Sequence, residues 1–508
     1  MTQAAKLGLV GVPPTLRIGA GNPEALKYGR MWEHPEYRQV APGEDLAALF
    51  LRVARPKAGA QVVDFGCGTG RGAVMLALLG LLKVTMVDFV RNCLDPGVRD
   101  MLGPRGDVLT FLKHDLEQPL PIHSQFGFCT DLMEHIPPDR VDRVLDNILK
   151  ASQHVFFSIA TKADVCGQLI GEPLHLTVRP AAWWREQFAK RDCVVHWAQD
   201  DEGALGRLLI YVTAWVSGED LTKSGVLNVE EREIVEHVKH NIAQGWAQAM
   251  PHDPNDFECV VLGGGPSMAT CEDDIKAKRA AGMKLITLNG AYHWALDHGL
   301  TPSAQIVVDA REHNKRFTKP VVDTCVYLLA SQCHPAVFEG LPKDRTYLWH
   351  TNPEPIRALL DAQYDLWQSI PGGSTVLLRA IPLMRMLGYS KFHLYGCDSC
   401  VAPEDVTRHH AYAQPENDGG IVLPVTLSDG RIFYANPWMV SQAQEFVALI
   451  QRMGDLFDLA IYGDGLLAHI LTTGAALPEP GPVLSEVVPG EDLQTSLIAT
   501  RGEEPNGP

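Results

Sequence analysis

The sequence has no apolar run long enough to cross a bilayer, and it carries no overall excess of positive charge. A membrane-spanning helix needs about 20 consecutive apolar residues, so we expect no membrane span. The formal net charge is −17, whereas binding to nucleic acid or to an anionic membrane requires a basic face. The first residues, MTQAAKLGLVGVPP, hold a single Lys and an apolar patch broken by proline, which makes a poor secretory signal.

Cysteine is sparse, with 11 residues in a chain of 508. Most of these cysteines stand inside apolar segments, where a free thiol behaves as a small hydrophobic side chain. Disulfides are rare in reducing compartments, so this usage predicts a cytoplasmic protein. The examples that carry the argument are Cys67, Cys129, Cys259 and Cys325.

The length exceeds what one hydrophobic core covers, and the composition is that of a soluble globular protein. Short apolar runs alternate with helical patterns twice along the chain, which predicts two doubly wound α/β domains of the Rossmann-like type. The predicted strands cover residues 61–65, 83–88, 108–113, 126–132, 155–159 and 208–215, and then 259–262, 285–288, 304–308, 326–329, 346–349 and 391–395. The predicted segments are a cap at 1–45, a first domain at 46–217, a helical linker at 218–256, a second domain at 257–473 and a disordered tail at 474–508.

A glycine-rich turn, VVDFGCGTGRG, follows the first predicted strand. Gly66, Gly68 and Gly70 let the backbone approach a ligand closely, and the free N–H groups of the next helix can meet its polar groups. Asp64 ends the strand before the turn, and Asp88 ends the next strand. An acid at that position typically accepts hydrogen bonds from ribose hydroxyls. The turn and the two acids together predict a nucleoside-bearing ligand.

Further polar residues follow the third and fourth predicted strands of this domain. The segment HDLEQPLP places Asp115 after the third strand, and FCTDLMEHIPP places Asp131, Glu134 and His135 after the fourth. The combination of DFGCGTG, the strand-end acids and the EHxP segment resembles the class I S-adenosylmethionine-dependent methyltransferases over about residues 45–215. That resemblance implies a seven-stranded sheet, with methionine at residues 64–70, ribose at Asp88 and adenine near Asp115. We include Asp131 among the residues expected to bind the cofactor.

Each of these residues also has a purely structural interpretation. Asp88 could cap a helix and Asp115 could stabilise a turn. His135 could act as a general base or serve only as a loop residue, because a methyl sulfonium reacts readily once it is positioned. In PLHLTVRPAAWWREQF, His175 and Trp183 are candidates to line an acceptor pocket, although the tryptophan pair is also typical of helix-to-sheet packing.

A second glycine turn, CVVLGGGPSM, lacks the third glycine of a dinucleotide fingerprint and the lysine of a Walker loop. Gly263 and Gly265 precede Pro266, which suits a first helical turn, and Ser267 can donate a hydroxyl. This arrangement predicts an anion-binding nest at a helix N-terminus, with a plain structural turn as the alternative. Asn289, Asp309 and Asp398 follow later strands and should converge on the same crevice, with His409 and His410 in a loop beside it.

Five features follow one another over about residues 257–470: GxGPS, a strand-end Asn, VVD, a GGS-helix and LGYxxxxLYGCD. This order resembles the domain shared by two enzyme groups. These are the archaeal 6-hydroxymethylpterin diphosphokinase-like proteins and the motility-associated flagellin glycosyltransferases, which are similar to bacterial sialyltransferases. The resemblance implies nucleotide phosphate at residues 263–267, sugar or metal at Asn289 and Asp309, and the reacting end at Asp398 with His409 or His410. A histidine would deprotonate an acceptor hydroxyl in a glycosyl transfer, whereas the acids would hold Mg²⁺ in a phosphoryl transfer.

The pair Cys397 and Cys400 followed by two histidines has ligand types suited to zinc, but a single CxxC is a weak pattern and we expect no metal centre. We therefore expect a bifunctional enzyme that methylates a small-molecule or glycan-like acceptor and binds a nucleotide or nucleotide sugar in its second domain. The alternative is a methyltransferase whose second domain only docks a partner. A nucleic-acid methyltransferase is disfavoured by the acidic charge and by TDLMEHIPP at the position of an Asn/Asp-Pro-Pro-Tyr segment.

Overall fold

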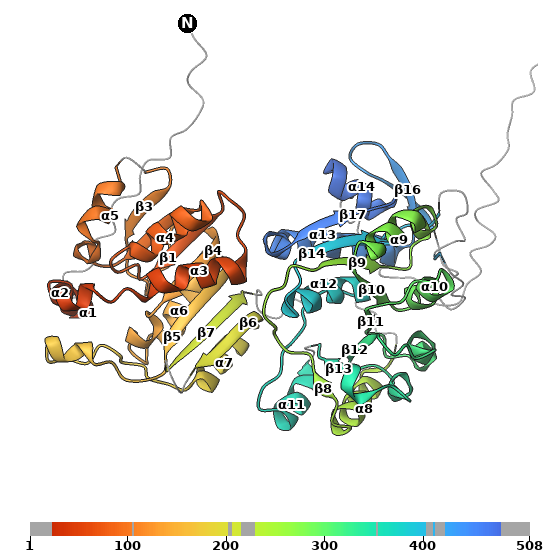
Figure 1. Ribbon diagram of the computed structural model, residues 1–508, viewed down its shortest axis with the longest axis horizontal. Coiled ribbons are helices and arrows are strands. Elements are labelled where there is room, and N and C mark those ends of the chain that lie inside the picture. Colours follow the sequence, from red (N-terminus) through yellow and green to blue (C-terminus); the bar gives the residue numbers. More distant parts are fainter. Residues whose placement is uncertain are drawn as a thin grey trace, which may run out of the picture.

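The computed structural model describes residues 23–103, 106–201, 206–214, 229–351, 354–402, 410–411 and 422–478. The chain forms two α/β units that lie side by side, with residues 23–214 in the first and residues from 229 onward in the second (Figure 1). Each unit is built on its own twisted sheet, as the alternation of apolar and helical segments predicts. The expected tail at 474–508 lies outside the described residues from 479 onward.

The first unit contains a seven-stranded sheet in the order β3-β2-β1-β4-β5-β7-β6, and its last two strand pairings, β5 with β7 and β7 with β6, are antiparallel. The predicted seven-stranded fold is thus confirmed. Six strands fall close to their predicted positions, whereas β6 was missed because its second half is polar and partly exposed. The strands are β1 Gln61–Phe65, β2 Lys83–Asp88, β3 Leu109–Lys113, β4 Ser124–Thr130, β5 Ser152–Ala160, β6 Val194–Asp201 and β7 Arg207–Thr213.

Helices cover both faces of this sheet, and short helices lie at the carboxyl ends of the strands. Helix α4 begins directly after Gly70, and it buries Leu76 and Ala77 against the sheet. Phe50 of α3 packs edge-to-face against Phe128 and Phe156, which stack on each other in the core. The helices are α1 Pro23–Met31, α2 Pro35–Arg38, α3 Pro42–Ala54, α4 Arg71–Gly80, α5 Pro96–Met101, α6 Val141–Ala151 and α7 Ala181–Ala189, with short 3-10 turns η1 Arg91–Cys93, η2 Met133–His135 and η3 Cys166–Leu169.

The second unit contains an eight-stranded sheet in the order β17-β14-β9-β10-β11-β12-β13-β8, and all of its pairings are parallel. A separate antiparallel hairpin, β15–β16, lies outside this sheet. The strands are β8 Ala247–Gln248, β9 Glu258–Leu262, β10 Lys284–Leu288, β11 Ala304–Val307, β12 Val326–Ala330, β13 Thr346–Trp349, β14 Lys391–Tyr395, β15 Leu423–Thr426, β16 Ile432–Ala435 and β17 Asp458–Ile461.

The described part of the segment expected to link the two domains, residues 229–256, packs on the second unit. Helix α8 packs on α11, and β8 pairs with β13 at the edge of the second sheet. Ile234, Val238 and Ile242 of α8 are buried, and the helix packs on α11 and on the 3-10 turn η6. The helices are α8 Glu231–Ala243, α9 Glu272–Ala280, α10 Ala291–Asp297, α11 Glu354–Gln363, α12 Val376–Met386, α13 Pro437–Met453 and α14 Leu466–Thr473, with 3-10 turns η4 Pro266–Thr270, η5 Glu312–Thr318, η6 Pro335–Phe338, η7 Lys343–Arg345 and η8 Gly454–Leu456.

A buried arginine joins the two units. Arg385 of α12 is 1% exposed, and its guanidinium donates hydrogen bonds to the carbonyls of Val53 in α3 and Leu456 in η8, at 2.9 and 3.1 Å. Trp197 of β6 donates its indole N–H to Asp253 at 2.6 Å across the same junction. Since buried donors and acceptors must be paired, these bonds favour one fixed arrangement of the two units.

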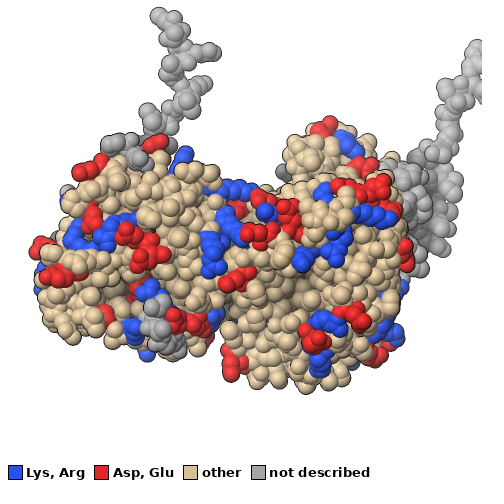
Figure 2. Space-filling view, viewed as in Figure 1, with Lys and Arg blue, Asp and Glu red and all other residues tan. Residues whose placement is uncertain are grey.

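The surface carries both signs of charge. Lys and Arg are interspersed with Asp and Glu over the face shown in Figure 2, so this face holds no extended basic area. None of the helices in the described part of the chain is long and apolar enough to cross a membrane.

Candidate functional sites

The first glycine turn adopts a backbone conformation that is unfavourable for residues with a side chain. Gly66, Gly68 and Gly70 have φ values of 66, 51 and 77°, in the left-handed region that favours glycine. A Cβ on Gly66 would lie 2.8 Å from Leu132, and one on Gly68 would lie 3.0 Å from the Trp32 ring. The glycines are therefore required both by the turn and by the closely packed residues above it.

Two buried carboxylates lie beside this turn. Asp88 is 6% exposed and accepts hydrogen bonds from the N–H groups of Gly68 at 3.3 Å and Val90 at 3.0 Å. Burial raises the pKa of Asp88 to about 6, and burial together with the Asp88 charge raises the pKa of Asp64 to about 7. No described residue donates a hydrogen bond to the Asp64 carboxylate. A cationic or hydroxyl-bearing ligand would therefore stabilise both groups in their charged forms.

A cavity opens at the carboxyl ends of the strands and brings together much of the predicted site. Five predicted residues line it: the cofactor-binding candidates Gly66, Asp88, Asp115 and Asp131, and the proposed base His135. Asp115 also accepts the Glu117 N–H at 3.0 Å, which is the turn role considered as its alternative. The remaining lining residues are Glu24, Tyr28, Trp32, Tyr37, Phe89, His114, Leu116, Glu117, Leu132, Ile136, Pro137 and Val144.

Aromatic residues of the N-terminal segment cover this cavity. Tyr28 and Trp32 come from α1 and the turn after it, and Tyr37 comes from α2. Trp32 and Tyr37 pack with their ring centroids 4.7 Å apart. The sequence marks these aromatics as part of a cap at 1–45, but it gives no indication of which of them face the ligand.

His135 is held in a defined orientation by its surroundings. Its Nδ1 lies 2.6 Å from the Tyr28 hydroxyl and 3.1 Å from the carbonyl oxygen of Leu174. A carbonyl can only accept, so the tautomer with its proton on Nδ1 donates to Leu174 and keeps the Nε2 lone pair, whereas the tautomer with its proton on Nε2 accepts the Tyr28 hydroxyl at Nδ1. Burial, followed by the neighbouring His175, lowers the pKa of His135 to about 3. The imidazole is therefore neutral at physiological pH.

Glu134, the other polar residue of the EHxP segment, supports the fold and does not line the cavity. It is completely buried, its Oε1 accepts the N–H of Ala160 at 3.0 Å, and its backbone carbonyl accepts the N–H groups of Leu176 and Thr177. Burial raises the pKa of its carboxyl well above the usual range. The residue thereby joins η2 to β5 and to the segment that carries His175.

The two acceptor-pocket candidates occupy different places. The His175 ring packs edge-on against His135 with centroids 4.8 Å apart, although His175 is not among the residues that line the cavity. Trp183 packs against Trp184 in helix α7, with ring centroids 4.9 Å apart, and it is away from the cavity. A role for Trp183 in an acceptor pocket therefore stays a prediction.

A second cavity lies at the carboxyl ends of β9, β14 and β17. Pro266, Ser267 and Asp398 line it as predicted, together with Asp464 and Arg431. The remaining lining residues are Thr270, Cys400, Val401, Ala402, Ile432, Phe433, Tyr434 and Gly465. The sequence missed Asp464 and Arg431, although the GDG of IYGDGLLAHI is itself a glycine-flanked acid after a strand.

The expected anion nest in this unit is filled by a carboxylate of the chain itself. Asp398 is 3% exposed, and it accepts the Ser267 N–H at 2.8 Å and the Ser267 hydroxyl at 2.6 Å. Gly265 is required because a Cβ there would collide with the Asp398 carboxylate. This corrects the expectation that residues 263–267 present free donors to a phosphate. Burial, and then the Asp464 charge, raises the pKa of Asp398 to about 6.

The other acid and the amide predicted for this site, Asp309 and Asn289, lie elsewhere on the sheet edge. Asp309, after β11, forms an ion pair with Arg311, with its oxygens 2.5–3.1 Å from the guanidinium nitrogens. Asn289, after β10, has φ of 47° and a buried Oδ1 with no described partner. Neither residue lines the second cavity.

The loop that follows Asp398 is described only in part. His409 lies outside the described residues, whereas His410 lies next to Ala411, whose N–H donates to the Gly264 carbonyl at 2.9 Å. Cys397 and Cys400 are buried, and within the described ranges they belong to no group of three metal-ligating side chains. A role for His409 or His410 at the reacting end therefore stays a prediction.

Comparison with known proteins finds a matching family model in each half of the chain. Residues 62–153 match the family model described as "Methyltransferase domain", and residues 232–404 match "6-hydroxymethylpterin diphosphokinase MptE-like". The ubiquinone biosynthesis O-methyltransferase of Ralstonia nicotianae is 28% identical over 135 residues, which are 25% of this chain and 56% of that protein. The protein of the same name from Chromobacterium violaceum is 33% identical over 104 residues, covering 20% and 44% respectively.

The chain thus spans less than two thirds of the length of the curated relatives it matches. Among solved structures, magnesium protoporphyrin IX methyltransferase from Synechocystis PCC 6803 is 16% identical with a TM-score of 0.29, covering 38% of this chain and 86% of that one. The N-methyltransferase NodS from Bradyrhizobium japonicum is 14% identical with a TM-score of 0.30, covering 37% and 97%. The family matches and the strand order together show that the chain carries a methyltransferase domain in its N-terminal half and an MptE-like domain at residues 232–404.

Proposed function

We propose that the N-terminal unit transfers a methyl group from S-adenosylmethionine to a small-molecule or glycan-like acceptor. The observation that carries this proposal is the buried Asp88 at the end of β2, which faces the cavity beside the glycine turn. Its position suits two ribose hydroxyls, and Asp64 offers a second buried carboxylate without a described donor. The ammonium and sulfonium of the cofactor would supply the positive charge that these carboxylates lack.

The cofactor, when bound, supplies a methyl group on a positively charged sulfur. The chain's own residues would bind and orient the reactants around it: Asp88 holds the ribose, Asp115 lies near the adenine, and Asp131 faces the cavity beside the glycine turn. In the tautomer whose Nδ1–H donates to the Leu174 carbonyl, His135 would accept a proton from the acceptor at Nε2. Trp32 and Tyr37 cover the cavity and would exclude water from the reacting groups.

Replacing Asp88 with Ala is expected to weaken binding of S-adenosylhomocysteine by about 2 kcal/mol, or about 30-fold, because buried ribose hydroxyls would lose their acceptor. Isothermal titration calorimetry on the full chain measures this change directly. The exposed Asp107 provides a matched control, since Asp107→Ala removes a carboxylate of the same domain away from the cavity. Unchanged affinity in Asp88→Ala would contradict the assignment of the ribose to this residue.

We further infer that the second unit binds a nucleotide or nucleotide sugar and transfers a glycosyl or diphosphoryl group. The second cavity supports this inference, because Asp398 and Asp464 lie together with the Arg431 guanidinium. Two carboxylates fit Mg²⁺ bound to phosphates, and a guanidinium fits a phosphate oxygen. In this arrangement Asp398 and Asp464 would hold the cation, and Arg431 would bind the phosphate group.

A docking role for the second unit is favoured by one observation, namely the occupation of both Ser267 donors by Asp398. A thermal-shift screen separates the two possibilities. For a nucleotide-binding unit, ATP with Mg²⁺ or a cytidine-monophosphate sugar raises the unfolding temperature, since a ligand that binds only the folded state stabilises it. Asp464→Asn should remove this shift without disturbing the fold, because Asp464 is exposed. Absence of a shift with every nucleotide favours the docking role.

A further inference from the structure

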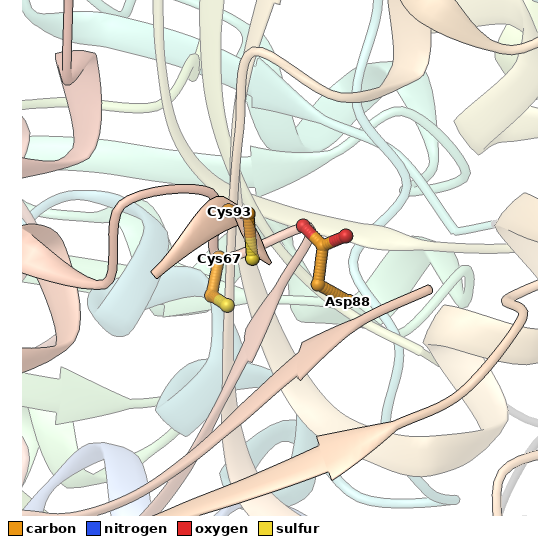
Figure 3. Close-up of side chains that lie close together, drawn as sticks. All are labelled: Cys67, Asp88 and Cys93. Atoms are coloured by element: carbon orange, nitrogen blue, oxygen red, sulfur yellow. The ribbon is translucent and has the colours of Figure 1, made fainter. Parts of the chain in front are cut away.

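Three potential metal ligands lie together beneath the first glycine turn. The Sγ atoms of Cys67 and Cys93 and a carboxylate oxygen of Asp88 all lie within 4.8 Å of one another (Figure 3). Cys67 belongs to the turn after β1, Asp88 ends β2, and Cys93 ends η1. The two cysteines are far apart in sequence and form no CxxC pattern, so the sequence gives no indication of this cluster.

The packing around the cluster keeps the three side chains in place. Cys93 is completely buried, and its thiol donates to the Val90 carbonyl at 2.8 Å. Asp88 is fixed by the N–H groups of Gly68 and Val90. Cys67 is partly exposed and follows Gly66, which lines the cavity. The ligand atoms are therefore preorganised, and the cavity provides a route by which an ion can reach them.

The distances and the chemistry suit a tetrahedral thiophilic cation. Zinc binds thiolate sulfur at about 2.3 Å and carboxylate oxygen at about 2.0–2.2 Å, so ligand atoms around one ion lie roughly 3.5–4 Å apart. All three ligand atoms lie within 4.8 Å of one another, so at most a small contraction would bring them to that spacing. A water molecule from the cavity would complete the coordination, as in other three-ligand sites.

We propose that Cys67, Asp88 and Cys93 form a binding site for a thiophilic divalent cation such as Zn²⁺. Binding forms two metal–sulfur bonds and one metal–oxygen bond, and it releases the two thiol protons to solvent, with no change in oxidation state. The Asp64 carboxylate lies close enough to Asp88 to interact with its charge, and it would add negative potential next to the ion.

Metal binding at this cluster would oppose cofactor binding, and this consequence rests on the proposed function. The same Asp88 carboxylate is assigned to the ribose of S-adenosylmethionine, so the cation and the cofactor would compete for it. Zinc would then act as an inhibitor of the N-terminal unit and not as its catalyst. Cofactor present at ten times its dissociation constant should weaken apparent metal binding about 11-fold if the two exclude each other.

The test uses the full chain, fully reduced and stripped of metal, titrated with Cd²⁺ as a spectroscopic substitute for Zn²⁺. We expect one equivalent to give the ultraviolet charge-transfer absorption of thiolate–cadmium bonds, and Zn²⁺ to displace it. Cys93→Ser should lose the absorption, whereas Cys271→Ser, a matched change at a half-buried cysteine of the second unit, should retain it. The thermal unfolding of each variant shows whether its fold is intact.

Absence of a stoichiometric charge-transfer band in the wild type, or equal bands in wild type and folded Cys93→Ser, would overturn the site. A band that S-adenosylhomocysteine leaves unchanged, although calorimetry shows that the compound binds, would overturn the competition. If the metal-free protein binds no S-adenosylhomocysteine while the cadmium band persists, the proposed cofactor site fails and the metal site stands.

Discussion

Lowering the pH from about 7.5 to about 5 is expected to destabilise the chain through two histidines buried beside the junction of the two units. His154 of β5 and His196 of β6 are completely buried and share the Thr213 hydroxyl, at 2.8 and 2.6 Å. The Arg385 guanidinium lies close enough to disfavour a second positive charge. Tyr211 packs against His196 and offers no charge that would compensate.

Burial, and then Arg385, lowers the pKa of His154 to about 3 and lowers that of His196 well below its ordinary value. Because both values are lower in the folded state, the unfolded chain binds more protons below about pH 6.5, and stability falls as the pH falls. At about pH 5, His154 alone should lower the free energy of unfolding by about 2 kcal/mol. His196 acts in the same direction.

Urea unfolding at the two pH values measures this effect, with the difference between variant and wild type as the readout. The comparison is necessary because the buried carboxylates Asp64 and Asp398 have raised pKa values and contribute in the opposite direction. His154→Leu and His196→Leu should each reduce the loss of stability on acidification, whereas His252→Leu, at an exposed position, should not. An identical pH dependence in all three variants would contradict the explanation.

Substituting His135 with Asn is expected to slow methyl transfer about 10²-fold, at the low end of the range for a general base, because burial makes this imidazole a weak one. The affinity for S-adenosylhomocysteine should stay the same, since the proposed role is in proton transfer. Transfer of a labelled methyl group from S-adenosylmethionine to a panel of phenols and saccharides provides the measurement. The wild type identifies the acceptor on which the variants are compared.

Tyr28→Phe is the companion variant, because it removes the hydroxyl at 2.6 Å from Nδ1 and keeps the bond to the Leu174 carbonyl. We expect it to reduce the rate much less than His135→Asn, since the Nε2 lone pair remains. A wild-type rate in His135→Asn would assign the residue to the loop alone. Equal losses in both variants would indicate that the aromatic cover, and not the imidazole, sustains the rate.

The first site could be predicted from sequence because its determinants are local. Gly66, Gly68 and Asp88 follow directly after apolar strands, and parallel strands bring such ends to one edge of the sheet. The Tyr28–His135 contact could not be predicted, because it joins residues 107 positions apart through the packing of α1. The strand β6 was missed for a related reason, since its pairing with β7 determines its structure more than its composition does.

The second site was predicted less well, because the pattern showed which residues gather but not what they bind. The glycine turn, Ser267 and Asp398 do come together. Their pairing satisfies the donors that the sequence suggested for a phosphate. Asp309 likewise forms an ion pair with Arg311, two positions along the chain. The position of Asp309 at the end of a strand gives no indication of this local pairing.

The arrangement of the two units lies beyond sequence patterns altogether. Arg385 looks like an exposed residue of the last turn of α12, yet it is buried and bound to carbonyls of Val53 and Leu456. Such contacts depend on the shapes of two independently predicted domains. The apolar core of one unit is continuous with that of the other.

Equilibrium dialysis of the full chain against S-adenosylmethionine with a labelled methyl group tests the central claim most directly. One equivalent per chain should bind, and S-adenosylhomocysteine, but not ATP, should displace it. This result would place a cofactor in the N-terminal unit and leave the second cavity for a different ligand. Failure to bind any S-adenosylmethionine, or displacement by ATP as readily as by S-adenosylhomocysteine, would contradict the account.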